Sequence, residues 1–482
     1  MLVQTPQPSI RHLPNTSCLP AGALDWPPPA PLSHVLKELT ATDEASCAQA
    51  CVAFRNEDAS PVSGWTRCLS FTWVPKLSRC LGVVDANEVS CSAEAGAASG
   101  LLTWPPRRCH SDADCSFNGV CAADAQCKCD DAWSGDRCQT LALRPARRGA
   151  GYRRTDGGVN TSSWGGAVLL DAKTGTYHMW ASEMMLHCGI DSWTSNSRIV
   201  HATSRDGETF SRRSVVFPAF SHEPNVIRAP SGEWVMYFTS SPPGKSPPPP
   251  CDQCAEGRSL ANSTCAGGAG GSGPTYMSIA RSPEGPWSKP ERLFGAPAQA
   301  KQINMDTNLA VVILPNGSAV GIARTSGRPQ GINTHLVTAA DWRNASSYVG
   351  RWSTLLFPDT TVVPDAGLED PSVYVDGRGR FHAVFHNQIE ADDERLAGGH
   401  AYSVDGISWT FGGTSWSNRV RFDDGTSYVF SRRERPHLVF GDAAAPTRIT
   451  ALTTGVQFGE GSPTYAPGQD ACYTLLQPVG KE

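Results

Sequence analysis

The C-terminal part of the chain, residues 150–482, carries a pattern of apolar and polar positions that recurs about every 60 residues. Each unit opens with an apolar run, passes through a turn into a second run and ends in a third, with no helical periodicity between them. The opening runs are residues 166–170, 225–228, 308–312, 372–375 and 437–440. Such units are typical of propeller blades. The pattern therefore predicts an all-β fold, a five-bladed β-propeller, in which the fifth unit, residues 420–455, is the weakest.

The third strands of three units end in a shared signature. It reads HATSRDG at 201–207, ARSPEGPW at 280–287 and AYSVDGISW at 401–409. Residues 241–273 are rich in Pro, Gly, Ser and Cys and predict a long surface loop between two strands of the second unit. The layout and signature resemble the five-bladed propellers of glycoside hydrolase family 43 and its relatives in families 32 and 62. The resemblance spans most of residues 150–482.

Acidic residues recur near the starts of the predicted innermost strands. They stand in His222-Glu223-Pro224, Asn304-Met305-Asp306, Glu369-Asp370-Pro371 and Glu434-Arg435-Pro436. Because innermost strands converge on the propeller axis, carboxylates there would repel one another and some pKa values would rise. A protonated carboxyl beside an ionised one is the pair that glycoside cleavage needs. The alternative is that acid-proline pairs at strand starts are ordinary turn chemistry.

The family resemblance assigns roles to two catalytic candidates and leaves the third role, the base, without a matching residue. It implies that Glu369 is the general acid and that Asp306 tunes this acid and holds the sugar. A base aspartate is expected at the first blade, where this chain has NTSSWGG at 160–166. Asp156 or, from the second blade, Glu223 would have to act as the base. The missing aspartate of the first blade weakens the prediction of hydrolysis more than the prediction of sugar binding.

Several neighbours of these acids are candidates for contacting the sugar. The predicted substrate-binding residues are Trp164, His222, Asp370 and His386, with Trp193 as a further ring that could stack on a sugar. His382 and His386 share one face of a predicted strand, so they either line the funnel or form hydrogen bonds in the core. Glu434, which lies between two arginines, is expected to form a structural ion pair. The residues predict no cofactor and no metal site.

Cysteine usage sets the upstream part of the chain apart. Twelve of the 17 cysteines lie between Cys18 and Cys138, a density typical of oxidising compartments. Residues 41–54 favour a helix that places Cys47 and Cys51 on one face, able to reach a neighbouring sheet. With the strand-like runs at Cys68 and Cys80, residues 18–92 resemble a PAN/apple domain, an α+β fold. That resemblance implies the pairs Cys47–Cys80, Cys51–Cys68 and Cys18–Cys91. A disulfide-stapled spacer is the alternative.

The second cysteine-rich segment, residues 109–139, has the spacing C-x5-C-x5-C-x5-C-x-C-x8-C. About thirty residues cannot bury enough apolar surface to fold without staples. The spacing, the Asn118-Gly119 turn and the closing run WSGDRC at 133–138 resemble an EGF-like domain. A zinc site is disfavoured because the cysteine pairs have the wrong separation. The resemblance implies three disulfides, which are Cys109–Cys121, Cys115–Cys127 and Cys129–Cys138.

Composition narrows the function classes. The formal net charge is −5 and charged residues make up 18% of the chain, so no basic footprint indicates nucleic acid. No apolar run is long enough to span a membrane. The opening MLVQTPQPSI shows no secretory signal, but the cysteines, supported weakly by five Asn-x-Ser/Thr sequons, favour a secreted or cell-surface protein.

Two functions follow from these patterns. The first is an extracellular carbohydrate-active protein that hydrolyses a polysaccharide or glycan. The second is a non-catalytic adhesion protein whose propeller binds a glycan or protein in the same funnel. In either case the PAN-like and EGF-like segments are expected to contact extracellular matrix or cell-surface proteins.

Overall fold

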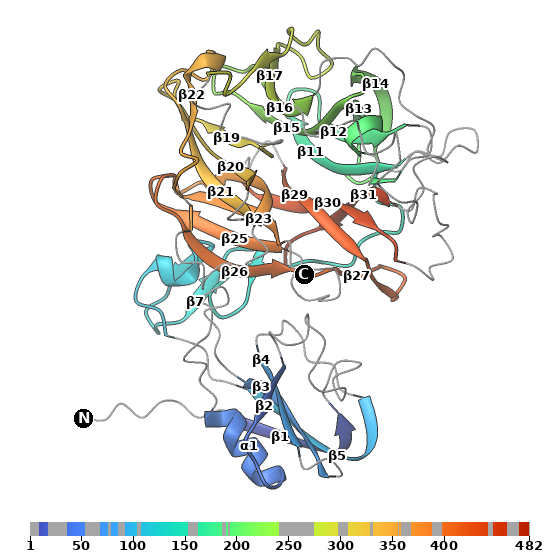
Figure 1. The fold of residues 1–482 in the computed structure, drawn as a ribbon, viewed down its shortest axis with the longest axis vertical. Coiled ribbons are helices and arrows are strands. Elements are labelled where there is room, and N and C mark those ends of the chain that lie inside the picture. The colour runs from blue at the N-terminus through green and yellow to red at the C-terminus, as the bar shows by residue number, and fades with distance from the viewer. Residues whose placement is uncertain are drawn as a thin grey trace. The chain divides into compact units, whose positions relative to one another are not determined.

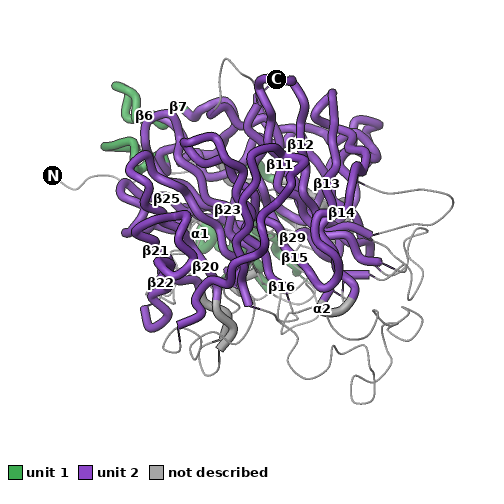
Figure 2. The backbone as a smooth tube through the Cα atoms, turned by 90° about the horizontal axis from the view of Figure 1, so that it is seen from above, with its two compact units in different colours: residues 1–115, 120–128, 359–364 green, residues 116–119, 129–358, 365–482 purple. Residues whose placement is uncertain are grey.

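The computed structural model describes seventeen segments of the chain. They are residues 9–17, 36–53, 68–75, 79–84, 92–103, 108–152, 162–185, 189–190, 193–240, 274–296, 307–327, 331–354, 356–357, 368–387, 398–441, 447–459 and 472–481. The chain forms two compact units, coloured separately in Figure 2: residues 1–115, 120–128 and 359–364, and the remainder. Among the described residues, no helix combines the length and apolar character needed to cross a membrane.

The first unit contains an antiparallel sheet clipped to one helix. The sheet has the order β1-β5-β3-β4-β2, and its strands are β1 (Ser9–Ser17), β2 (Leu36–Leu39), β3 (Cys68–Val74), β4 (Arg79–Val84) and β5 (Ser92–Thr103). Helix α1 (Glu44–Ala53) begins where the Asp43 carboxylate accepts a hydrogen bond from the Ser46 backbone N–H at 2.7 Å. Cys47 and Cys51, one helical turn apart, are fully buried and bond to Cys80 of β4 and Cys68 of β3. These are the two pairs that the PAN/apple resemblance implies; the expected Cys18–Cys91 pair lies outside the described residues.

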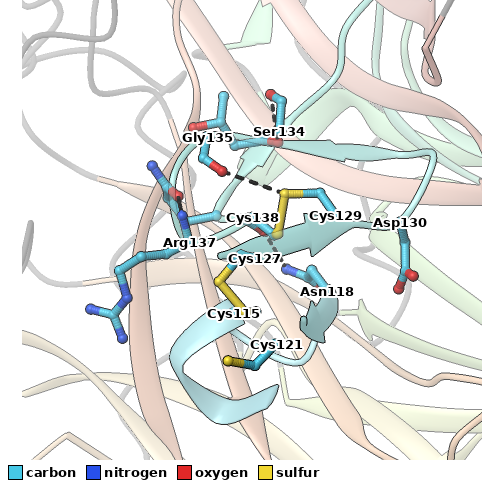
Figure 3. The surroundings of a disulfide bond; sticks show 12 residues. Cys115, Asn118, Cys121, Cys127, Cys129, Asp130, Ser134, Gly135, Arg137 and Cys138 are labelled. Carbon is cyan, nitrogen blue, oxygen red and sulfur yellow. Dashed lines mark hydrogen bonds between the residues drawn. A yellow bond between two sulfur atoms is a disulfide. The ribbon is translucent and has the colours of Figure 1, made fainter. Parts of the chain in front are cut away.

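Three disulfides hold the segment around residues 109–138. Cys109 bonds to Cys121, Cys115 to Cys127 and Cys129 to Cys138, as the EGF-like resemblance implies. The elements are short: η3 (Asp112–Cys115), β6 (Gly119–Cys121), β7 (Cys127–Cys129), β8 (Trp133–Ser134) and β9 (Thr140–Leu141). Asn118 links the first half of the segment to its last cysteine, because its side-chain amide donates a hydrogen bond to the carbonyl of Cys138 at 3.0 Å (Figure 3).

The second unit is a five-bladed β-propeller built from five four-stranded antiparallel sheets (Figure 1). The first blade comprises β11 (Ser163–Asp171), β12 (Thr176–Met184), β13 (Ser197–Ser204) and β14 (Ser211–Phe217), with the short helix α2 (Trp193–Asn196) before β13. The second comprises β15 (Ser221–Arg228), β16 (Trp234–Ser240), β17 (Thr275–Ala280) and β18 (Glu291–Arg292). The third comprises β19 (Ala310–Ile313), β20 (Ala319–Gly327), β21 (Gly331–Ala339) and β22 (Tyr348–Gly350), with η7 (Ala345–Ser347) before β22. The fourth comprises β23 (Leu368–Val375), β24 (Phe381–Asn387), β25 (Gly398–Ser403) and β26 (Thr410–Trp416).

The fifth blade differs from its prediction. It consists of β29 (Arg432–Phe440), β30 (Ile449–Gln457), β31 (Cys472–Pro478) and, as its outermost strand, β10 (Gly151–Tyr152) from the start of the domain. The predicted range 420–455 was wrong at both ends. Val420 lies in a separate two-stranded sheet of β27 (Arg419–Arg421) and β28 (Ser427–Val429), and the blade takes two of its strands from outside that range. A blade assembled from both ends of the domain has no regular repeat in the sequence, which explains its weak pattern.

Strand β10 closes the ring. It pairs with β31 of the fifth blade, and its Gly151 N–H donates to the Glu208 carbonyl of the first blade at 2.7 Å. The Tyr152 hydroxyl then donates to the Glu183 carboxylate at 2.6 Å, and Glu183, fully buried, also accepts from Arg198 Nε at 2.7 Å. The first and fifth blades are therefore joined by backbone and by a buried polar network. Figure 1 shows β11 lying beside β29 and β30 at this junction.

The core lies between blades. Strand β16 is buried on both faces from Trp234 to Thr239, because each sheet is packed between two others. This explains why the blade strands are nearly continuous apolar runs rather than strict alternations. One cluster joins the first and second blades around Trp180 and Trp234, and another joins the second and third around Tyr237 and Trp342.

The segment of the second unit that follows Lys128 packs on the fourth blade. The Trp133 indole lies 4.8 Å from the His400 ring, and Ser415 donates a hydrogen bond to the Gln139 carbonyl at 2.9 Å. Arg378 forms an ion pair with Asp130. These contacts attach this part of the disulfide-bonded segment to the propeller.

One prediction concerns packing inside the fourth blade. A Cβ added at Gly398 would lie 1.8 Å from the Trp416 indole, which is 1% exposed and has no room to move. We expect Gly398→Ala to lower the free energy of unfolding by about 1–3 kcal/mol through overpacking. Gly295→Ala is the matched control, since its Cβ would meet nothing within 4 Å. Urea denaturation of both variants tests this, and equal stabilities would contradict it.

Candidate functional site

The first strand of four blades distorts at the same place, and in the third blade the equivalent residue, Asn308, directly precedes the first strand, β19. A single residue there has left-handed backbone geometry: Gly165 (φ 58°), Glu223 (φ 61°), Asn308 (φ 39°), Asp370 (φ 52°) and Arg435 (φ 56°). In four of the five strands the pairing register shifts at this residue, which marks a β-bulge. Proline follows it in three blades, and proline suits a bulge because it has no N–H to donate to the ladder. Because the five positions are equivalent, they bring one residue of each blade together near the axis.

Arg435 lies at the centre of this ring. Its guanidinium Nη1 is 2.9 Å from Asp370 Oδ1 and 3.2 Å from Glu223 Oε2. Its backbone N–H also donates to Asp370 Oδ2 at 3.2 Å, and Asn308 donates to Glu223 Oε2. Gly165 completes the ring by its lack of a side chain, because a Cβ there would lie 2.5 Å from Arg435 Cβ. One buried cation thus connects all the blades that supply these residues.

A second layer surrounds His386 of β24. Glu369 Oε1 lies 3.2 Å from His386 Nδ1, and Glu369 Oε2 lies 2.6 Å from the Arg324 guanidinium. On the other side of the ring, Glu434 Oε1 lies 3.9 Å from His386 Nε2 and 3.4 Å from Arg432 Nε. The imidazole is therefore held between two carboxyl groups from different blades. We call Glu223, Arg324, Glu369, Asp370, His386, Glu434 and Arg435 the axial cluster.

Burial shifts the proton affinities of the cluster in different directions. Burial raises the pKa of Glu434, against the opposing effects of His386 and Arg432. Burial also raises the pKa of Asp370, against the nearby Arg435 guanidinium. For His386, burial disfavours the charged ring, but the carboxyl groups of Glu434 and Glu369 outweigh it and raise its pKa. Two chemically similar carboxyl groups beside one histidine, Glu369 and Glu434, thus have different electrostatic surroundings.

His222 is close to the cluster but already engaged. Its ring is 2% exposed, with Nδ1 2.6 Å from the Ser197 hydroxyl and Nε2 3.7 Å from Glu223 Oε1. Trp193 stacks on it at 5.0 Å between ring centroids. Burial holds the pKa of His222 well below its usual range, with Arg435 and Arg324 acting in the same direction. His222 is therefore neutral, and although it lies beside Glu223 it does not balance the charge of that carboxylate.

The cluster also has the geometry of a cation site. One ligand atom each from Glu369, Asp370, His386 and Glu434 lies within 4.8 Å of the others. The guanidinium groups of Arg324 and Arg435 already contact oxygens of Glu369 and Asp370, and they supply there the positive charge that a metal ion would bring. These four residues are the ones that could hold a divalent ion among the described parts of the propeller.

The structure brings most predicted site residues together. Glu223, His222, Glu369, Asp370 and His386 all lie in or against the axial cluster. Asp306 and Asp156 lie outside the described residues, so their roles stay predictions.

Two expectations need correction. Trp164 is 3% exposed and packs in the core with Met184 and Ile190, so its ring is not free to stack on a sugar. Glu434 does contact Arg432, as expected, but it also faces His386 and belongs to the site. His382, by contrast, lies in the core against His400 at 3.0 Å.

Three residues of the site, Arg324, Glu434 and Arg435, were not assigned to it from the sequence. Glu434 and Arg435 carry a visible signal, since Glu434-Arg435-Pro436 repeats the pattern of Glu369-Asp370-Pro371 at the equivalent bulge. Arg324 had none, because it comes from the second strand of its blade, β20, and reaches the axis only in the folded structure.

Comparison with known proteins gives similarities of fold. No protein-family model and no curated protein matches the chain. Among solved structures, it is similar to Zg3597, a family 117 glycoside hydrolase of Zobellia galactanivorans, with 13% identity and a TM-score of 0.45 over 73% of this chain and 91% of that one. It is also similar to a thermostable family-43 glycoside hydrolase (12% identity, TM-score 0.44, 69% and 94% covered). A third is the catalytic domain of a GH62 α-L-arabinofuranosidase of Coprinopsis cinerea (12%, 0.44, 72% and 97%). At these identities and scores, any function has to be argued from the axial cluster itself.

Removal of the central cation should be costly. Arg435→Met leaves Glu223 and Asp370 buried without their shared guanidinium, and breaking a buried pair in this way destabilises a protein by about 3–5 kcal/mol. Arg448→Met is the matched control, because its ion pair with Asp131 is about half exposed on both sides and we expect it to cost at most about 1 kcal/mol. Equilibrium unfolding in urea measures both. Equal, small losses would show that Arg435 does not hold the axial residues.

The shifted groups predict a pH effect on stability. The pKa values of Glu434 and His386 are raised above their ordinary 4.5 and 6.5, so from pH 4.5 upward the folded state binds protons more tightly than the unfolded chain. Their contribution to stability is full below those values and is lost as the pH rises through the raised ones. Glu434→Gln removes the carboxyl and also the charge that raises the pKa of His386. The stability of this variant relative to the parent should therefore increase with pH.

This pH effect can be measured by urea unfolding of the parent and Glu434→Gln between about pH 4.5 and pH 8. Glu291→Gln is the control, since Glu291 is exposed on β18, and its stability difference should stay constant. A constant difference for Glu434→Gln would show that Glu434 titrates normally.

Proposed function

We propose that the chain is an extracellular carbohydrate-active enzyme that hydrolyses glycosidic bonds of a polysaccharide or glycan at the axial cluster. The observation that carries the proposal is the unequal pair Glu369 and Glu434 on either side of His386. Burial raises the pKa of Glu434, whereas Glu369 is ion-paired with the buried guanidinium of Arg324. Glycoside cleavage needs one carboxyl group of each kind.

The contacts favour a division of roles different from the one implied by family resemblance. Glu434 would give its proton to the oxygen of the leaving sugar as the bond from that oxygen to the anomeric carbon breaks. Glu369 would act as the carboxylate that attacks the anomeric carbon or takes a proton from water. Glu223, bound by Arg435 and Asn308, is the second carboxylate candidate, in the base role. Asp306 remains the residue expected from resemblance to hold the sugar and tune the acid.

The buried charges support function over a purely structural role. Four acidic residues and two arginines lie within the propeller centre, each with a side chain at most 16% exposed. Such a network contributes little to stability compared with apolar packing, whereas shifted proton affinities concentrate at catalytic sites. The most exposed side chain of the cluster is that of Glu434, which suits a group that must reach a substrate.

The extracellular setting rests on the five disulfides between Cys47 and Cys138. Disulfides at this density are typical of secreted and cell-surface proteins. The same segments are expected to bind extracellular matrix or cell-surface proteins, as the PAN/apple and EGF-like resemblances imply.

Hydrolysis can be tested by incubating the full chain with a panel of polysaccharides and aryl glycosides and measuring the release of reducing ends. On a substrate that the parent cleaves, we expect Glu434→Gln and Glu369→Gln each to lower kcat roughly a hundred- to ten-thousand-fold. Glu291→Gln, on an exposed strand of the second blade, should retain full activity. If Glu434 is the acid, the parent should also lose activity as the pH rises through its raised pKa.

The same panel of substrates distinguishes hydrolysis from the alternative function, adhesion through glycan binding. Binding of a glycan by the parent without any cleavage would support the adhesion function, which is favoured by the absence of a carboxylate at the described start of the first blade, Trp164-Gly165-Gly166. Full activity of Glu434→Gln with loss in Glu369→Gln would instead restore Glu369 as the acid.

A further inference from the structure

A second recess lies at the opposite ends of the blade strands. It is an open cleft of about 880 Å³ between the first and second blades. The turn after β11, the ends of β13 and β15, and the residues that follow β17 line it. The axial cluster, by contrast, lies where the first strands begin. The cleft is therefore separated from the axial cluster by the length of the strands, within the same compact unit.

The inner wall of the cleft is a pair of buried histidines. His178 of β12 and His201 of β13 stack with ring centroids 5.2 Å apart, and His178 Nδ1 lies 2.9 Å from His201 Nε2. Burial lowers the pKa of His201 to about 4, so the pair is uncharged at neutral pH. Among the described residues, His201 Nδ1 has no hydrogen-bond partner although it is buried. A buried polar atom left in this state is one that a ligand or a water can satisfy.

The fourth blade contains the same pair, and there other side chains cover it. His382 of β24 and His400 of β25 stand at the equivalent strand positions, with Nδ1 and Nε2 3.0 Å apart. Trp133 packs against His400, and the Asn118 amide lies 3.4 Å from its Nε2. The first blade has no such covering segment among the described residues. The two blades thus show the same histidine pair, covered by described residues in the fourth blade and facing the cleft in the first.

The rim of the open recess is positively charged. Its basic residues are Lys173, Arg205, Arg213, Arg228 and Arg281, against the acidic residues Asp171, Asp206 and Glu284. The acids are largely engaged locally: Asp206 accepts from Ser204 and from the Thr209 N–H, and Glu284 accepts from Ser282. Of the described residues, none forms an ion pair with Arg228 or Arg281. The rim therefore offers guanidinium groups, which bind planar or tetrahedral oxyanions through paired hydrogen bonds.

The remaining lining distinguishes between anionic ligands. Hydroxyl groups are frequent there, among them those of Thr174, Thr203 and Ser211, and they suit the hydroxyls of a sugar. A nucleotide would need an aromatic surface on which its base could stack. Trp234, the one indole of the lining, is 2% exposed and is covered by the Arg228 guanidinium at 5.3 Å from the ring centroid.

We propose that this cleft is a binding site for acidic saccharides, sugar units that carry sulfate or carboxylate groups. The guanidinium groups of Arg213 and Arg228 hold the oxyanion, and the threonine and serine hydroxyls bind the sugar. The site goes beyond hydrolysis at the axis, since it requires no chemistry and no residue of the axial cluster. It would hold a charged stretch of glycan against the propeller.

The test is calorimetric titration of the full chain with four probes. They are a sulfated heparin-derived tetrasaccharide, a galacturonate oligomer, a neutral maltotetraose and inorganic phosphate. We expect at least one acidic saccharide to bind, with a Kd that rises with added salt, and the two acidic probes tell sulfate from carboxylate. Arg213→Gln and Arg228→Gln should each weaken that binding about tenfold, the effect of losing a charge-assisted hydrogen bond.

Two controls make the result specific. Arg292→Gln removes an exposed arginine of the same blade that does not line the cleft, and it should leave the Kd unchanged. Glu434→Gln should also leave it unchanged, so that failure of the axial proposal and failure of this one can be told apart. The proposal is overturned if no acidic saccharide binds, if maltotetraose or phosphate binds as tightly, or if Arg213→Gln and Arg228→Gln bind like the parent.

Discussion

The centre of the propeller depends on one buried guanidinium. Arg435 contributes a single positive charge that two carboxylates from two other blades share, Asp370 at 2.9 Å and Glu223 at 3.2 Å. A buried ion pair is favourable only when its geometry is good and its remaining hydrogen-bonding groups are satisfied. Here Asn308 from a further blade completes Glu223, and the missing side chain of Gly165 leaves the space for Arg435. The same contacts of Arg435 therefore bring the blades together and neutralise the carboxylates at the propeller axis.

This constraint also shapes the chemistry above it. Arg435 contacts Glu223 and Asp370, whereas Glu434 faces His386 and Arg432. Glu369 takes the other buried arginine, Arg324. The unequal surroundings of Glu369 and Glu434 thus follow from how the two buried guanidinium groups, with the more exposed Arg432, are divided among four acids. An ionised and a protonated carboxyl can coexist there without any difference in side-chain chemistry.

Features that repeat along the sequence could be predicted from it, whereas features built from distant parts of the chain mostly could not. All five opening runs lie on or directly before first strands, because sheets packed on both faces need continuous apolar segments. Glu223, Glu369 and Asp370 could be found because their bulges carry acid-proline pairs. The closing strand β10 could not, since two residues, Gly151 and Tyr152, carry no periodicity. Trp164 was assigned to sugar because the pattern places it at a strand start and says nothing of the core it enters.

The bulged first strands explain how one fold can present chemistry at the axis and binding at the far ends. At the axial end, left-handed residues interrupt the ladder and turn their side chains toward neighbouring blades. Away from the bulge, the far ends of the second and third strands of a blade can carry polar side chains, such as His178 of β12 and His201 of β13, without disturbing the centre. Because the strands of the blades run from the cleft to the axial end, a glycan held in the cleft by its charges would stay attached to the propeller while the axial cluster acted on another part of the same glycan. That arrangement raises the local concentration of substrate at the axis without altering a single catalytic contact.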